Sequence, residues 1–191
     1  MCDEHFSDRR LYPIEVFNEM RRNQKKMLEE LDEFTIKKLK QGADNDIIRR
    51  AREQSLSSYY QGIDRDGVME FETTAITTDG QSRWEQEIKL LDLEDAIDVG
   101  KDDMELSDRD IADLAIYGDV AVHCNCPSFK WHGYQYIAWQ LDYGLKPQNN
   151  KPDTRNPDRK GTVCKHLYNV FVVLPSHIDA VFDDLRRMGK I

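Results

Sequence analysis

The sequence predicts an α+β fold, because segments with helical and with strand periodicity follow one another along the 191-residue chain. Apolar residues recur at intervals of three or four over residues 14–59, which is typical of amphipathic helices. The period changes to two over 68–76 and 84–90, which indicates β-strands. A chain of this length suits one domain, or one domain with an appended helical arm.

Residues 1–60 predict a helical arm that forms an αα-hairpin. The first helix is expected from Ile14 to about Gln41, with Gly42 as its C-cap, because its apolar residues keep to one face. Asp44 is expected to cap a second helix that runs to about Tyr59. The apolar face of the arm must be covered, either by the rest of the chain or by a second copy in a coiled coil. The short heptad match favours packing within the subunit.

Residues 61–191 predict an α+β domain with a small antiparallel sheet. Asp79-Gly80 lies between the two alternating segments and is a strong hairpin signal. A strand at Val120–Cys124 is expected to join this hairpin. A loop is expected at Gly100, and Ser107 begins a capping-box pattern. The other expected helices cover residues 93–99, 107–116, about 136–143, 165–174 and 176–189.

Three of the four cysteines belong to a spaced pattern, Cys124-x-Cys126 and Cys164-x-His166, whose halves are separated by 37 residues. Residues i and i+2 of an extended segment point to the same face, so Cys124 and Cys126 can reach one ion. Cys164 is expected just before a helix, with His166 in its first turn. Cys3His is a common tetrahedral Zn²⁺ set in which the protein fills all four positions, so the spacing predicts a structural zinc site. Lys130 and Lys165 are expected to offset its negative charge.

Three alternatives remain open for these residues. His123 or His132 could replace His166 as the fourth ligand, although His123 points away from both cysteines in a regular strand. The cysteines could be small buried residues without a metal. A cysteine paired with His123 or His166 could be a catalytic nucleophile.

The pattern resembles the SWIM zinc finger, a module associated with binding DNA or other proteins. The resemblance covers residues 119–175. It extends to His123–Phe129, Gly133–Tyr136, Arg155–Pro157 and Gly161–Tyr168, which together look like a group of SWIM-bearing proteins of tailed bacteriophages. Many proteins of that group are labelled virion structural proteins. The 37-residue separation is longer than in the usual module, so the metal ligands carry over but a nucleic-acid surface does not.

This resemblance implies a non-enzymatic structural or assembly component of a phage virion, with a structural Zn²⁺ on Cys124, Cys126, Cys164 and His166. The implied partners are other virion proteins and copies of the same chain. The implied location is the virion or the host cytoplasm.

Charge and aromatic residues suggest nucleic-acid binding as the alternative function. The net charge is −9, but residues 61–120 carry 18 acidic and five basic side chains, whereas 121–191 carry ten basic and six acidic ones. Any contact with phosphate therefore belongs to the C-terminal part. Five cations lie between residues 144 and 161: Lys146, Lys151, Arg155, Arg159 and Lys160. Six aromatic residues precede them and either stack on bases or, as we favour, pack around the metal: Phe129, Trp131, Tyr134, Tyr136, Trp139 and Tyr143.

Several function classes lack support in the sequence. No run of 18 apolar residues predicts a membrane span, and residues 1–6 do not look like a secretory signal. Clustered cysteines at metal spacing favour a reducing compartment over a disulfide framework. Phosphate-binding glycine loops, GxSxG and HExxH motifs are absent, so we predict that the protein is not an enzyme.

Overall fold

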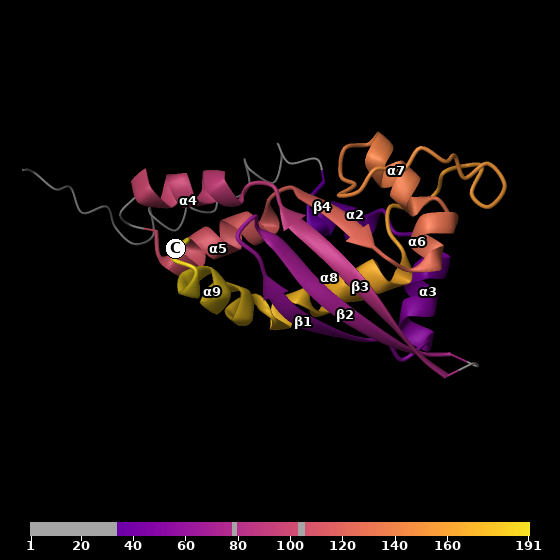
Figure 1. Cartoon of the computed structure of the whole chain (residues 1–191), viewed down its shortest axis with the longest axis horizontal. Helices are drawn as coiled ribbons and strands as arrows, with labels where there is room; N and C mark the ends of the chain where they lie inside the picture. The colour runs from indigo at the N-terminus through magenta and orange to yellow at the C-terminus, as the bar shows by residue number, and fades with distance from the viewer. Residues whose placement is uncertain (1–33, 78–79, 103–105) are drawn as a thin grey trace, which may run out of the picture. The chain divides into compact units, whose positions relative to one another are not determined.

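The computed structural model describes residues 34–77, 80–102 and 106–191, and the predicted α+β fold is confirmed. Its centre is a four-stranded antiparallel sheet in the order β1-β2-β3-β4 (Figure 1). The strands are β1 (Ser57–Ile63), β2 (Val68–Thr77), β3 (Gly80–Leu90) and β4 (Val120–Cys124). The predicted hairpin is β2–β3, in which Thr77 pairs with Gly80, and the predicted third strand pairs with β3 as β4.

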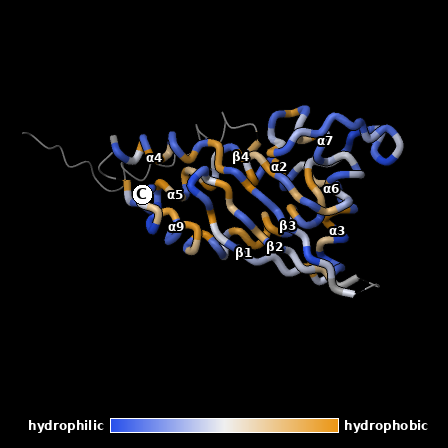
Figure 2. Tube along the Cα trace, viewed as in Figure 1, coloured by the Kyte–Doolittle hydropathy of each residue, from blue (hydrophilic) through white to orange (hydrophobic). Residues whose placement is uncertain are grey.

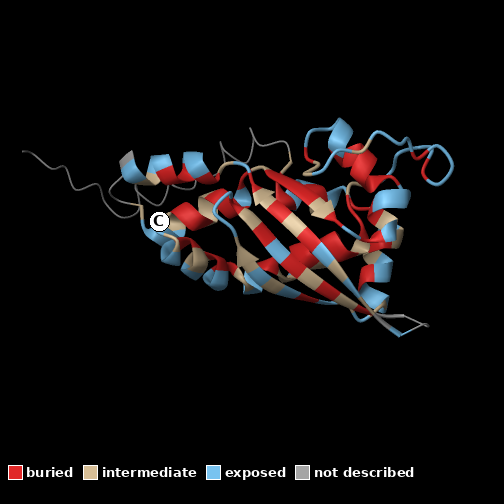
Figure 3. Ribbon diagram, viewed as in Figure 1, coloured by how far each residue is buried: buried red, intermediate tan, exposed pale blue. Residues whose placement is uncertain are grey.

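The two faces of the sheet differ in polarity, as the alternation of burial along the strands shows (Figure 3). The inner face carries buried residues such as Phe71, Ile88 and Val122. The open face carries glutamates in directly opposite cross-strand pairs, Glu70 with Glu87 and Glu72 with Glu85. Like charges in such positions repel one another, but Arg83 lies 3.7 Å from Glu72 and Lys146 lies 2.5 Å from Glu87, so cations offset part of the repulsion.

Helices cover the inner face and both ends of the sheet. The helix α8 (Lys165–Val173) contacts β1, β2 and β3, and α2 (Ile36–Gln41) and α3 (Asn45–Glu53) pack on α8. At one end of the sheet lie α4 (Leu93–Asp102), α5 (Asp108–Tyr117) and α9 (Ile178–Arg187), which follows a short 3-10 turn at Leu174–Ser176 (Figure 1). At the other end, α6 (Pro127–Trp131) and α7 (Tyr134–Gln140) pack on β4. None of the described helices has both the length and the apolar character that crossing a bilayer requires.

The predicted helical arm differs from the structure where the two can be compared. Most of the expected helix from Ile14 to Gln41, and with it the coiled-coil alternative, lies outside the described residues. Within the described residues, the expected helix is interrupted at Thr35, which is extended and bridges to Asp119. Thr35 also caps α2, because its side chain accepts a hydrogen bond from the Lys38 backbone amide (3.2 Å). The break is a tertiary effect, since the Phe34 amide also donates to the Asp119 carboxylate (2.7 Å).

The second helix of the expected αα-hairpin is also shorter than predicted. It ends at Glu53, and residues expected to be helical up to Tyr59 enter strand β1 instead. The pairing of β1 with β2 explains the change, and the buried hydroxyls of Ser58 and Thr73 lie 2.7 Å apart across the two strands. The expected domain boundary between residues 60 and 61 therefore falls inside a strand.

Gly100 does not form the expected loop, because α4 continues to Asp102. A Cβ added at this glycine would lie 2.1 Å from Cδ1 of Ile111 on α5. The glycine therefore permits close packing of α4 on α5 rather than ending the helix. The predicted capping box at Ser107 is present, with reciprocal hydrogen bonds to Asp110.

Candidate metal centre

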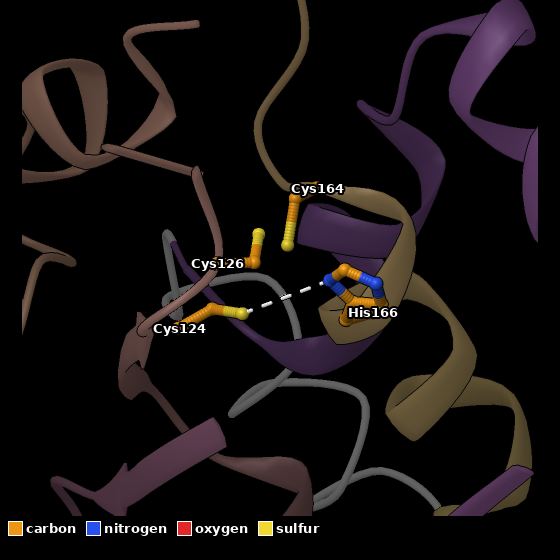
Figure 4. Close-up of side chains that lie close together, drawn as sticks. All are labelled: Cys124, Cys126, Cys164 and His166. Atoms are coloured by element: carbon orange, nitrogen blue, oxygen red, sulfur yellow. Dashed lines mark hydrogen bonds between the residues drawn. The ribbon is translucent and has the colours of Figure 1, made fainter. Parts of the chain in front are cut away.

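Four side chains from two distant segments converge beneath one end of the sheet. They are Cys124, Cys126, Cys164 and His166, all buried, and their ligand atoms lie within 4.8 Å of one another. Figure 4 shows the three sulfurs and the imidazole pointing toward a common centre. The Cys124 sulfur and Nδ1 of His166 are 4.0 Å apart, so Nδ1 is the nitrogen that faces the sulfurs. These four residues are the ones that the spacing predicts.

Local backbone structure explains how each ligand is placed. Cys124 is the last residue of β4, and Cys126 follows on the same side as the N-cap of α6. Pro127 occupies the first turn of α6, where its missing amide hydrogen costs nothing. The Phe129 amide donates to the Cys126 sulfur (3.2 Å). Cys164 is the N-cap of α8, which places His166 in the first turn, as expected.

A buried chain of hydrogen bonds crosses the inner face of the sheet and ends at the centre. The Asn169 amide on α8 donates to the Ser58 hydroxyl (2.8 Å), which lies 2.7 Å from the Thr73 hydroxyl. Thr73 donates to Oε1 of Gln86 (2.6 Å). Nε2 of Gln86 then lies 3.7 Å from the Cys124 sulfur, as a donor. Each of the four strands therefore contributes one residue to this chain.

Gln86, which contacts the Cys124 sulfur, is the residue of the site that the sequence pattern did not predict. It is fully buried, and its amide also donates to the Trp84 carbonyl (2.7 Å), so its orientation is fixed at both ends. The only available signal was its parity, because Gln86 alternates in phase with the inward-facing Ile88 and Leu90. Hydrogen bonds to metal-bound sulfur orient the ligand and stabilise its negative charge.

His166 is held by packing rather than by a second hydrogen bond. Its ring stacks on Trp84 with a centroid distance of 5.8 Å, and its Nε2 has no hydrogen-bond partner within the described ranges. The alternative ligands lie elsewhere. The His123 ring packs edge-on against Phe129, and His132 packs against Tyr134, so neither joins the group of four.

The electrostatics of the centre favour a bound cation. Burial raises the pKa of the Cys124 thiol and of the Cys164 thiol. Hydrogen bonds from Cys124 and Cys164 lower the pKa of Cys126. Without a cation, these hydrogen bonds favour one thiolate, at Cys126, beside two protonated thiols, whereas a divalent cation stabilises all three thiolates. The N-terminus of α8 adds the positive end of its dipole beside Cys164.

The two expected counter-charges differ in position. Lys165 lies close enough for Cys126 and Cys164 to favour its charged form, although burial lowers its pKa overall, and its ammonium donates to the Gln54 side chain. Lys130 is exposed, and its ammonium lies 4.8 Å from the Trp131 ring centroid. Lys165 is therefore the cation coupled to the cysteines, and Lys130 belongs to a separate surface.

The dimensions of the group fit a tetrahedral metal ion. Zn–S bonds of about 2.3 Å give a tetrahedron whose edges are about 3.8 Å long. The largest ligand–ligand separation, 4.8 Å, exceeds this edge by about 1 Å, which small side-chain rotations can close. The residues can therefore hold a metal ion, and no disulfide links the three described cysteines.

The aromatic residues after Cys126 fall into two groups. Most of them are buried around the centre and its neighbouring helices, as the packing alternative predicts: Phe129, Tyr134, Tyr136 and Tyr143. Trp131 and Trp139 are 53% and 38% exposed, respectively. These six rings therefore do not form an extended stacking platform, and Trp131 is the most exposed of them.

The segment from 144 to 161, here called the 144–161 loop, has no helix or strand and is largely hydrophilic (Figure 2). It is fastened internally by Asn156, a buried side chain that donates to the Lys160 carbonyl (2.9 Å) and accepts from the Lys160 amide (2.9 Å). Its first residues extend the sheet edge, where the Leu145 amide donates to the Val122 carbonyl (3.0 Å). The loop therefore has a defined path over α6 and α7.

Comparisons with protein-family models, curated proteins and solved structures find no match to this chain. The resemblance to SWIM fingers and to phage virion proteins thus stays a prediction from the motif.

Proposed function

We propose that Cys124, Cys126, Cys164 and His166 bind one structural Zn²⁺, and that the protein is a non-enzymatic structural or assembly component of a tailed-phage virion. The convergence of these four buried side chains carries the metal proposal. The virion role rests on the motif resemblance, and its proposed partners are other virion proteins and copies of this chain.

The ligand chemistry supports zinc among the divalent ions. Thiolate and imidazole ligands suit Zn²⁺, whereas Mg²⁺ and Ca²⁺ prefer oxygen. Four protein ligands complete a tetrahedron and leave no open position for water or substrate. Complete burial of the four side chains also keeps substrate away from them. A structural role is therefore better supported than a catalytic one.

Zinc bound here would join the sheet edge to the helix that covers the sheet. Two ligands belong to the end of β4 and the start of α6, and two belong to the start of α8. Structural zinc sites contribute about 10–16 kcal/mol of apparent binding free energy in small modules, which is comparable to the total stability of a domain. We infer that the bound ion fixes the surface that neighbouring proteins recognise.

Elemental analysis of the purified protein tests the metal assignment. We expect one zinc ion per chain, and we expect Cys126→Ser and Cys164→Ser to lose it together with thermal stability. Cys2→Ser, outside the predicted ligand set, and His132→Ala should retain both. Because the ligand variants can fail to fold, chelation of the parent protein followed by zinc addition gives a second measurement. Equal thermal stability of all variants, or of the parent with and without chelator, would reject the site.

Mass spectrometry of purified particles tests the virion role separately. We expect the chain at a fixed copy number in virions of the phage that encodes it. Its absence from the particles would end this part of the proposal and leave the zinc site untouched.

A further inference from the structure

The structure separates the five cations of the 144–161 loop into two classes. Three have partners: Lys146 pairs with Glu87 (2.5 Å), Lys160 pairs with Asp158 (3.1 Å), and the Arg159 guanidinium lies 5.5 Å from the Tyr136 ring centroid. Lys151 and Arg155 form no ion pair within residues 34–77, 80–102 and 106–191. These two cations are therefore available to an external anion.

Lys151 and Arg155 line the same surface pocket, which also contains Trp131. The pocket has a volume of about 340 Å³, and Pro152 and Thr154 complete its lining. No carboxylate lines it. Trp131 is 53% exposed, and the ammonium of Lys130 lies against its ring. The pocket thus combines an accessible indole with a local excess of positive charge.

Close packing fixes the pocket relative to the metal centre. Trp131 ends α6, whose N-cap is the metal-ligand candidate Cys126. Pro152 packs on Gly133, where an added Cβ would lie 2.2 Å from the proline ring and where φ is +90°. The backbone amide of Asn156 donates to the Pro152 carbonyl (2.9 Å), and this hydrogen bond holds the loop in position. The pocket is therefore formed before any partner arrives.

We propose that this pocket binds one nucleotide of a single-stranded nucleic acid, with the base stacked on Trp131 and the phosphates contacted by Lys151 and Arg155. Indole faces stack on any base, and neighbouring cations neutralise the backbone. An acidic peptide would use the two cations but would have little need for the indole face. The proposal goes beyond the structural role of the metal and does not require it.

Fluorescence anisotropy with a labelled oligo(dT) of about 10 nucleotides tests the proposal at low salt. Stacking on Trp131 predicts that Trp131→Ala weakens binding at least about fivefold. The control is Trp139→Ala, which removes the other exposed indole of this region but leaves the pocket intact, and it should change the affinity less than twofold.

The salt dependence of binding and two double variants test whether Lys151 and Arg155 contact the phosphates. The two phosphate contacts of Lys151 and Arg155 predict a slope of about −1.4 for log K against log salt. The double variant Lys151→Ala/Arg155→Ala should reduce this slope and the affinity. The matched control, Lys146→Ala/Lys160→Ala, removes the same charge from partnered positions and should have a smaller effect on both.

Three results would overturn the proposal. One is the absence of oligo(dT) binding at low salt. Another is equal weakening by Trp131→Ala and Trp139→Ala. The third is displacement of the oligonucleotide by polyglutamate, combined with an affinity for polyglutamate that Trp131→Ala leaves unchanged. This result would favour an acidic protein partner. The zinc content of every variant is measured alongside, so that loss of the metal site is distinguished from loss of the pocket.

Discussion

At the scale of single residues, the candidate metal centre depends on side chains that do not themselves face the metal position. Gln86 connects the Cys124 sulfur to the hydroxyl of Thr73, and its second amide hydrogen is occupied by the Trp84 carbonyl. A buried amide with all its hydrogen bonds satisfied has one orientation. Gln86 is therefore a positioning residue for Cys124.

Gln86→Glu tests this role with little change of shape. The variant replaces the amide donor near the sulfur by a carboxylate, so we expect zinc affinity to fall about 10- to 100-fold, as for other residues that support metal ligands. Competition with a chromophoric chelator measures the affinity. Gln61→Glu makes the same substitution at an exposed position of β1 and should leave the affinity unchanged.

A purely structural role for Gln86 makes a different prediction. It would lower stability without changing the thiolate-to-metal absorption of the Co²⁺-substituted protein. A shift of that band in Gln86→Glu, but not in Gln61→Glu, supports the contact with the Cys124 sulfur. An unchanged band together with unchanged affinity would show that Gln86 does not act on this ligand.

At the scale of secondary-structure elements, contacts between distant segments decide where several helices begin and end. Asp119 binds the Phe34 amide and bridges to Thr35, so the chain before α2 is extended. The β1 segment lacks a clear apolar alternation, and its pairing with β2 makes it a strand. Position 100 of α4 is a glycine that packs against α5 and does not end the helix, because α5 approaches too closely for a larger side chain. None of these interactions is visible in a local sequence window.

Gly100→Ala tests the packing of α4 on α5, because close packing predicts a decrease in the free energy of unfolding and open space predicts an increase. In an open helix position, alanine would stabilise by about 1 kcal/mol relative to glycine. Here the added methyl group meets Ile111, so we expect destabilisation of about 1–3 kcal/mol in urea unfolding. Gly100→Ala/Ile111→Val removes part of the overlap and should recover part of the loss. A stabilising effect of Gly100→Ala alone would contradict the close approach.

At the scale of the whole described part, residues 34–77, 80–102 and 106–191, the metal centre connects the sheet to its covering helix. Because α8 packs on β1, β2 and β3, an ion held between β4 and α8 would stabilise more than its immediate surroundings. The pair α4–α5 lies at the opposite end of the sheet, where α5 packs on α9 (Figure 1). Stability is therefore expected to depend on the metal unevenly across the fold.

Hydrogen exchange with and without chelator measures this distribution. We expect metal removal to increase amide exchange more than about tenfold in β3, β4 and α8, because the helix is no longer joined to the sheet edge. The α4–α5 pair should change less. Unchanged protection in α8 would show that the ion does not hold the helix on the sheet.

The sequence by itself determined the α+β class, the β2–β3 hairpin with its third strand, the Ser107 capping box and the four candidate metal ligands. These features depend on spacing between residues that are close in sequence. The strands follow a period of two, and the ligands follow Cys-x-Cys and Cys-x-His. Only the tertiary structure decided the break at Thr35, strand β1, the position of Gln86 and the partners of Lys146 and Arg159. Each of these depends on a partner that is distant in sequence or on another element, and the free energy of such contacts outweighs local propensity.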